Sequence, residues 1–377
     1  MNTIQSLRIE KWMAPVWNGD RVWEESVCFF EDAEGNIRGG NLLYERFKIT
    51  SVINYDASVV YEEHIDYEIT DKGICRTEHS RIPVLKRQDY VSPYEGIPQI
   101  EWLCLPGKEY FVHIKPDIHE YQILVTYEVD AAHDEWGWAG IIPAAQGMGL
   151  PETYGRLERN ESLHIVYYGD SITAGWEASG ADETAIDMYT LEPIRIHFER
   201  YPKMPVWARL VTEQLQSMFP NAKVTGDNLS AGGSTAKWGL DHVNELFDRV
   251  ETPDLVFLGF SMNCMWDPAE TFIEYIDGIV SEIRKRNPLC EFVVYPAMVA
   301  NPEMEAYRHD NLLMYERALT GYAARREGIV CAPVHSMFRE VMARGKEYYE
   351  ISGNAVNHPN DFAIRLYAQV IWETICR

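Results

Sequence analysis

The 377-residue chain has few cysteines, and their spacing forms no recognisable site. The seven cysteines are Cys28, Cys75, Cys104, Cys264, Cys290, Cys331 and Cys376. They are scattered, odd in number and never in a CxxC pair. A disulfide framework needs paired cysteines, and a structural zinc site needs closely spaced ligands. The pattern therefore predicts reduced, mostly buried thiols, no bound metal ion and a cytoplasmic location.

Long apolar runs and basic side chains are also scarce. The N-terminal stretch MNTIQSLRIEKWMAPVW lacks an apolar core of signal-peptide length, and no run is long enough to cross a bilayer. Lys and Arg number 34 against 58 Asp and Glu, so the formal net charge is −24. Such a chain repels phosphate backbones and anionic lipid, which argues against nucleic acid or a membrane as a partner. A neutral substrate meets no such repulsion, and the charge also favours solubility.

The length is sufficient for two domains, and the two parts of the chain differ in pattern. Residues 45–130 hold short β-type runs punctuated by Gly, Pro and Asp, among them FKITSVINYD, IPQIEWLCLP and YQILVTYEVD. This spacing predicts an all-β sandwich resembling a jelly roll. A Gly- and Pro-rich segment at 136–162 is interpreted as the connection. We therefore predict a β-sandwich accessory domain at 1–150 and a second domain at 151–377.

From residue 163 onward, apolar strands alternate with amphipathic helices. The predicted strands are 163–169, 223–230, 254–261, 290–297 and 329–334, and the predicted helices are 205–219, 241–250, 269–287, 312–328 and 360–376. This order predicts an α/β fold whose parallel sheet has helices on both faces. Ligand sites in such sheets lie beyond the carboxyl ends of the strands.

Four polar features follow the predicted strands at that edge. Gly169 permits a sharp turn before Ser171, whose N–H would be free in the first helical turn; alternatively, Ser171 caps that helix. DNLSAGGSTAKWG brings backbone N–H groups at Gly233 toward a cleft, unless it is a plain turn. Asn263 in FLGFSMNCMWD offers an amide donor, or alternatively caps the following loop. His358 lies directly before Pro359, which keeps it on a loop, and it is either a base or a structural residue. Together they form an acyl-transfer set of nucleophile, oxyanion donors and base.

These four blocks make residues 162–377 resemble the SGNH hydrolases, also called GDSL-type esterases. The resemblance implies that Ser171 in GDSIT is the nucleophile and His358 in NHPND the general base. It also implies an oxyanion hole made by the N–H groups of Ser171 and Gly233 and by the amide of Asn263. No metal or organic cofactor is expected.

The chain departs from the family pattern at three positions. The family often has an Asp three residues before the histidine, where this chain has Ala355. Ser261 and Cys264 replace a Gly and an Asp around the asparagine block. Either a backbone carbonyl orients the imidazole in a Ser–His dyad, which we expect, or an acid from elsewhere in the chain completes the pair. The other nearby polar candidates are Asn354, Asn357 and Asp361, and we interpret Asp361 as a helix cap.

The two-domain layout is similar to the acetylxylan esterases of carbohydrate esterase family two. That resemblance implies removal of O-acetyl groups from xylo-oligosaccharides, an acetylated carbohydrate as the partner. Trp176, Trp238 and Trp266 follow the blocks and are candidates for sugar binding, or are ordinary core and rim residues. The long segment 176–205 is expected to shape the cleft or a homo-oligomer contact.

Two other functions stay open at this point. One is a general short-chain carboxylesterase or a lysophospholipase-like enzyme that uses the same chemistry. The other is an inactive, carbohydrate-binding relative, which the missing Asp before His358 favours.

Overall fold

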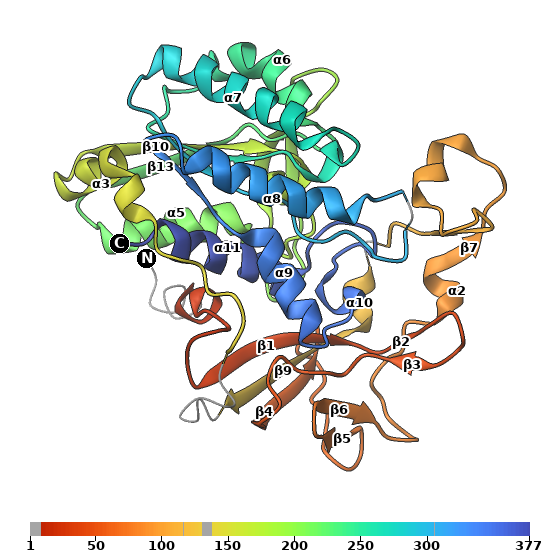
Figure 1. The fold of residues 1–377 in the computed structure, drawn as a ribbon. Coiled ribbons are helices and arrows are strands. Elements are labelled where there is room, and N and C mark those ends of the chain that lie inside the picture. Colours follow the sequence, from red (N-terminus) through yellow and green to blue (C-terminus); the bar gives the residue numbers. More distant parts are fainter. Residues whose placement is uncertain (1–8, 116, 130–137, 305) are drawn as a thin grey trace.

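The computed structural model describes residues 9–115, 117–129, 138–304 and 306–377. The first eight residues and the start of the predicted connection, Trp136 and Gly137, lie outside the described residues. Two parts are visible in Figure 1, a mainly β part (residues 9–129) below an α/β part (residues 138–377). Along the described stretches, no helix combines the length and apolar character needed to span a membrane.

A five-stranded parallel sheet forms the centre of the α/β part, in the order β13-β10-β14-β15-β16. Its strands are β10 (Ser162–Gly169), β13 (Lys223–Asn228), β14 (Leu255–Gly259), β15 (Glu291–Val294) and β16 (Ile329–Cys331). In the middle of the register, Tyr167 pairs with Asn228 on one side and with Phe257 on the other. Strand β10, the first of this sheet in chain order, therefore lies inside the sheet, which explains its nearly continuous apolar run.

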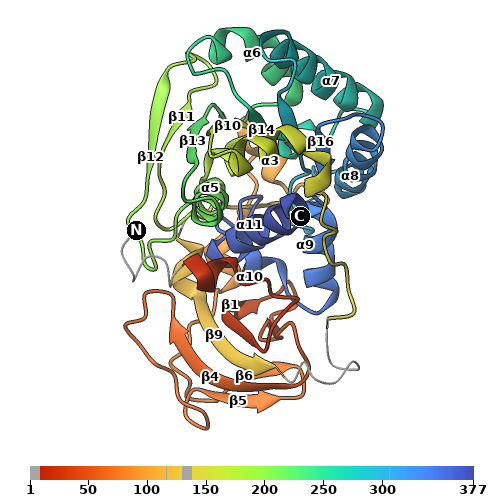
Figure 2. The same cartoon turned by 90° about the vertical axis from the view of Figure 1, so that its left-hand side faces the viewer.

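Helices cover both faces of this sheet, as predicted. Figure 2 shows α6 and α7 on one face and α5 and α11 on the other. The longer helices are α3 (Pro151–Glu158), α5 (Trp207–Met218), α6 (Ala236–Phe247), α7 (Ala269–Arg286), α8 (His309–Ala323), α9 (Val334–Ala343) and α11 (Asp361–Ile375). Nearly every side chain of α11 is buried, because this helix lies between the sheet and the β part.

The β part consists mainly of antiparallel strands, in agreement with the all-β prediction for residues 45–130. Its largest sheet has the order β1-β9-β4, and the remaining strands form two-stranded ribbons. The sheet strands are β1 (Arg21–Cys28), β4 (Phe47–Asn54) and β9 (Gln122–Val129). The ribbons are β2 (Phe30–Glu31) with β3 (Ile37–Arg38), β5 (Tyr67–Thr70) with β6 (Gly73–Arg76), and β7 (Val91–Pro93) with β8 (Tyr110–Val112). The predicted boundary at residue 150 stays a prediction.

One local expectation in this part was wrong, and one strand was not predicted. The run 97–106 forms a 3₁₀ helix, η1 (Pro98–Leu103), because Pro98 presets a helical φ at its first position and has no N–H for a ladder. Strand β1 was missed because its two adjacent acidic residues break the apolar pattern, and a bulge between Val22 and Glu25 breaks its alternation.

Several short elements complete the fold. They are α2 (Arg87–Tyr90), η2 (Ile118–Tyr121), η3 (Gly147–Gly149), α4 (Ser171–Ala174), β11 (Asp182–Ile186), β12 (Pro193–His197), η4 (Met262–Cys264) and α10 (Tyr348–Ile351). The β11–β12 hairpin occupies the long segment 176–205, so this segment has a regular structure of its own. Its assignment to a cleft wall or an oligomer contact stays a prediction.

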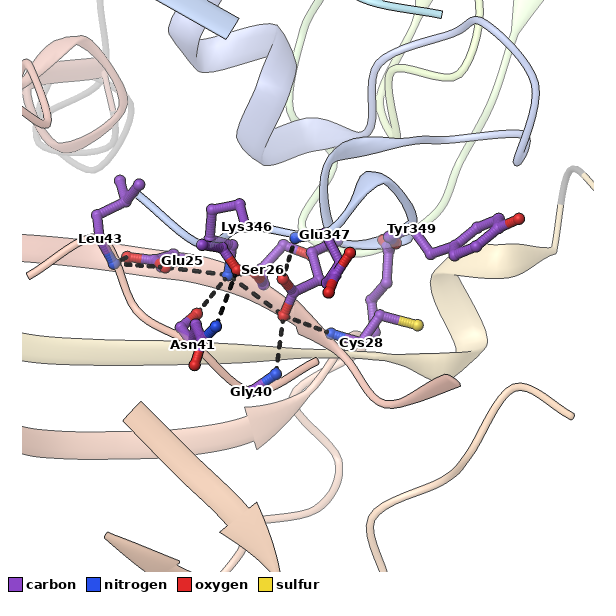
Figure 3. A network of polar contacts seen from close by, with 12 residues as sticks. Glu25, Ser26, Cys28, Gly40, Asn41, Leu43, Lys346, Glu347 and Tyr349 are labelled. Carbon is purple, nitrogen blue, oxygen red and sulfur yellow. Dashed lines mark hydrogen bonds and ion pairs between the residues drawn. The ribbon is translucent and has the colours of Figure 1, made fainter. Parts of the chain in front are cut away.

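A buried charge network joins the two parts of the molecule (Figure 3). The Lys346 ammonium lies 3.0 Å from a Glu25 carboxylate oxygen on β1 and 3.4 Å from a Glu350 oxygen on α10. It also donates to the backbone carbonyls of Ser26 (2.7 Å) and Asn41 (3.0 Å). Burial opposes the charge on Lys346, but Glu350 and Glu25 outweigh it and raise its pKa above the ordinary value. The lysine is therefore a charged link between the parts.

The same junction holds the segment that follows α10, residues 352–360, which we call the His358 loop. The Gln122 side chain, on β9, donates to the carbonyls of Tyr349 and Ser352, both at 2.8 Å. At the other end of the loop, the Asn360 amide donates to the Gln122 side-chain oxygen at 3.1 Å. One glutamine of the β part therefore contacts both ends of the loop.

Candidate active site

Ser171 lies at the carboxyl end of central strand β10, in the first position of α4. Asp170 caps this short helix, since its carboxylate accepts the Ile172 N–H at 3.0 Å. The alternative in which Ser171 is the cap is therefore wrong. As the first helical residue, Ser171 has no intrahelical acceptor for its own N–H. Gly169 allows this tight turn, because a Cβ there would lie 2.2 Å from the Gly259 carbonyl oxygen.

The Ser171 hydroxyl faces the imidazole of His358, which lies 187 residues further along the chain. The Nε2 atom of His358 lies 2.7 Å from the Ser171 Oγ. Ser171 is 8% exposed, and His358 is partly buried on its loop. Burial lowers the pKa of His358 from 6.5 to about 4, so the ring is neutral at pH 7. A neutral imidazole in contact with a serine hydroxyl can serve as its base when the nitrogen that faces the hydroxyl carries a lone pair.

The other nitrogen of His358 contacts the side-chain nitrogen of Asn354. The expected backbone carbonyl is therefore replaced at Nδ1 by an amide group. The sequence hinted at this, because Asn354 is polar and close, but its spacing of four residues differs from the family's three. Asp361 does not cap α11 either. Asn360 does, and Asp361 instead accepts the Ser179 N–H at 3.0 Å.

The glycine loop and the asparagine loop are bonded to each other next to Ser171. The Asn263 amide nitrogen donates to the Ser234 carbonyl oxygen at 3.0 Å. Gly233 adopts φ +79°, a left-handed conformation that favours glycine. A Cβ on Gly232 would lie 4.0 Å from the Ser171 Cβ, so this loop passes beside the serine. The structure thus brings the predicted loops together at one edge of the sheet.

The predicted tryptophans have different surroundings. Trp176 lies near the serine. A Cβ on Gly232, the residue that passes beside Ser171, would be 3.5 Å from the Trp176 Nε1 atom. Trp238 donates its indole N–H to the Met188 carbonyl at 3.0 Å. Trp266 is 57% exposed and lines a groove together with Trp102, which is 38% exposed.

The place of Trp102 in this groove was not predicted, because the run that contains it was interpreted as a strand of the accessory domain. Only the folded chain brings η1 to the loop after β14. All seven cysteines are free and most are buried, as predicted. Within the ranges that the structure describes, no group of three or more His, Cys, Asp or Glu side chains is arranged to hold a metal ion.

A parallel α/β sheet with a serine and a histidine in contact at its carboxyl edge defines a serine ester hydrolase. The model of the GDSL-like Lipase/Acylhydrolase family matches residues 167–363, just over half of the chain. The chain belongs to this family, and the predicted fold class and enzyme class are confirmed.

Solved structures offer more distant likenesses. A two-domain esterase (CEX) active on acetylated mannans, crystallised with mannopentaose, is 26% identical with a TM-score of 0.45. The match covers 62% of this chain and 54% of that one, so this chain spans about half the length of that esterase. A mutant of Axe2, an acetylxylan esterase from Geobacillus stearothermophilus, is 15% identical, with a TM-score of 0.42 and coverage of 57% and 96%. Among curated proteins, none matches.

Proposed function

We propose that this enzyme removes O-acetyl groups from short carbohydrates of the xylo-oligosaccharide type by serine acyl transfer. The contact of 2.7 Å between Ser171 Oγ and His358 Nε2 carries the proposal. It pairs a buried hydroxyl with a base that is neutral at pH 7. In this proposal, Ser171 is the nucleophile and His358 the general base.

The proposed reaction has two steps. His358 takes the Oγ proton on Nε2 while Oγ bonds to the acetyl carbon. The oxyanion is held by the N–H groups of Ser171 and Gly233 and by the second amide hydrogen of Asn263, whose first is directed at Ser234. The C–O bond to the sugar then breaks, and the sugar oxygen takes the proton from His358. Water hydrolyses the acetyl-enzyme by the same route in reverse.

The surroundings of Ser171 favour a short acyl group. Trp176 and Gly232 both lie beside the serine, since a Cβ on Gly232 would be 3.5 Å from Trp176 Nε1 and 4.0 Å from the Ser171 Cβ. The Met188 sulfur lies beside the next residue of this loop, 3.1 Å from where a Cβ on Gly233 would be. An acetyl group fits such a site better than a long acyl chain, which favours acetyl esters over lipid substrates.

A groove of about 490 Å³ supports a carbohydrate as the alcohol part of the ester. Trp266, three residues after Asn263, lines it from the α/β part, and Trp102 lines it from the β part. Exposed indole rings offer flat apolar faces for the C–H face of a sugar, and Glu101 and Lys108 add polar groups at the groove. A groove of two tryptophans is suited to a chain of sugar units. The contribution of Trp238, the homo-oligomer and the cytoplasmic location stay predictions.

Acetate release from acetylated xylo-oligosaccharides, with p-nitrophenyl acetate alongside, tests this proposal. Acetylated manno-oligosaccharides serve as a third substrate. We expect Ser171→Ala to abolish turnover of all of them. Trp102→Ala and Trp266→Ala should raise KM for the oligosaccharides only, by about tenfold for a lost aromatic contact of about 1.5 kcal/mol. Activity on the aryl ester alone would instead favour the general short-chain carboxylesterase.

A further inference from the structure

The orientation of the Asn354 amide is determined by the backbone around it. Its Oδ1 accepts three N–H groups, from Val356 (3.0 Å), Asn357 (3.0 Å) and His358 (3.1 Å). If the oxygen and nitrogen of this amide exchanged places, the side-chain NH₂ group would face the three backbone N–H groups, and these would have no acceptor. The oxygen must therefore point into the turn, and the NH₂ group must point out of it toward His358.

Three further contacts keep this turn in place. The Lys115 N–H donates to the Asn354 carbonyl at 2.9 Å, and the Asn301 side chain donates to the Ala355 carbonyl at 2.8 Å. The Asn354 NH₂ group also contacts the Asn357 side-chain oxygen at 3.3 Å. Asn354 is buried, so a reversed amide would leave buried donors without acceptors. The amide is therefore fixed in one orientation.

This orientation decides where the imidazole proton lies. The NH₂ group of Asn354 is a donor, so the His358 Nδ1 atom that it contacts must present a lone pair. In a neutral ring the proton is then on Nε2, the nitrogen that faces Ser171. At rest the imidazole donates to the serine hydroxyl instead of accepting from it.

We propose that Asn354 is a positioning residue that holds His358 in the Nε2–H tautomer and thereby keeps it a weak base. The proposal rests on the proposed function, in which Nε2 takes the serine proton. That step needs a free lone pair on Nε2, so the ring proton must first move to Nδ1. There it faces the Asn354 NH₂ group, which disfavours both this tautomer and the imidazolium that forms during the step. Asn354 thus limits the rate without touching the substrate.

Asn354→Asp tests the proposal with almost no change in shape. A carboxylate keeps one oxygen for the three backbone N–H groups and offers the other to a proton on Nδ1. The predicted outcome is a Ser–His–Asp triad within the existing fold. We expect kcat for p-nitrophenyl acetate at pH 7 to rise at least about tenfold, with KM changed less than about twofold, because the carboxylate accepts the Nδ1 proton and stabilises the imidazolium.

The tautomer itself is measured by ¹⁵N NMR of the imidazole nitrogens in the full-length protein, with the His358 signals assigned by their loss in His358→Gln. The wild type should show a proton on Nε2 and an unprotonated Nδ1, and Asn354→Asp should show a proton on Nδ1. Asn357→Asp is the matched control, because it adds the same charge next door but leaves the Asn354 donor in place. It should keep the Nε2–H tautomer, and kcat should rise less than in Asn354→Asp, because its charge acts on His358 only through space.

Two outcomes would overturn the proposal: a wild-type ring already protonated on Nδ1, or an Asn354→Asp enzyme with unchanged or lower kcat. If Asn354→Asp does not fold, the wild-type spectrum alone decides the matter. The NMR result needs no substrate. It therefore stands apart from the proposed function, which fails separately if no acetylated sugar is hydrolysed.

Discussion

The carboxylate of Asp170 accepts the Met262 N–H at 3.3 Å, across 92 residues of sequence. The same carboxylate caps the helix that begins with Ser171, through the Ile172 N–H at 3.0 Å. One buried side chain therefore sets the position of the serine relative to Asn263, the residue after Met262. Burial raises the pKa of Asp170 to about 7, so this carboxyl is partly protonated near neutral pH.

Asp170→Ala should lower both stability and activity. It leaves two buried N–H groups without an acceptor, at a cost of about 1–3 kcal/mol each. The free energy of unfolding in urea measures this loss, and kcat for p-nitrophenyl acetate reports the displaced loops. Asp170→Asn keeps an acceptor for Ile172 and should fall between the wild type and Asp170→Ala. Full activity and stability in Asp170→Ala would contradict this account.

Asn263→Ala should remove one oxyanion donor, and a loss of about 100- to 1,000-fold in kcat is typical of such a change. KM should change little, because the donor acts on charge that develops in the transition state. Asn244→Ala removes an exposed asparagine from α6 and serves as the matched control. A kcat within threefold of the wild type in Asn263→Ala would exclude this residue from the oxyanion hole.

The pH dependence of kcat/KM should follow the lowered pKa of His358. Its neutral form is the base, and burial lowers its pKa from 6.5 to about 4. The folded state thus resists protonation, so the active form persists as the pH falls and is half lost near pH 4. Between the two pKa values the unfolded state binds the extra proton, so this histidine also lowers stability as the pH falls.

Kinetics of the wild type and of Asp170→Asn between pH 3.5 and 8 test this, because the asparagine removes the Asp170 titration near pH 7 from the profile. If kcat/KM of both proteins instead declined below about pH 6.5, burial would not control the pKa of His358.

Lys346→Met should destabilise the junction between the two parts strongly. It leaves Glu25 and Glu350 buried without their cation, and breaking a buried pair in this way costs about 3–5 kcal/mol. Denaturant unfolding of the full chain measures the loss. Lys237→Met removes a lysine from a surface pair with Asp241 and should leave the midpoint unchanged. Equal midpoints for the two variants would mean that the network adds nothing to stability.

Local patterns were sufficient to predict the α/β part and the serine, glycine, asparagine and histidine blocks. Alternation of strands and helices predicted the parallel sheet and its two helical faces but not the order of its strands, and Gly169 and Pro359 marked the turns that carry Ser171 and His358. The sequence offered Asn354 as one of several polar candidates near His358, but its contact with Nδ1 could not be predicted, since it depends on how one turn folds around a side-chain oxygen. The groove of Trp102 and Trp266 was also beyond it, because residues 164 positions apart in the chain meet there only in the folded protein.

The bonds from Gln122 and Lys115 to the His358 loop have a consequence for how this protein can be rearranged. A gene fusion that replaces the first 129 residues with an unrelated module would keep every proposed reacting group but lose the partners that shape the loop under the base. Recombination at the junction would therefore succeed only when both sides of it change together. In such a fusion, turnover of a simple aryl ester would fall even where the preference for one sugar over another is unchanged.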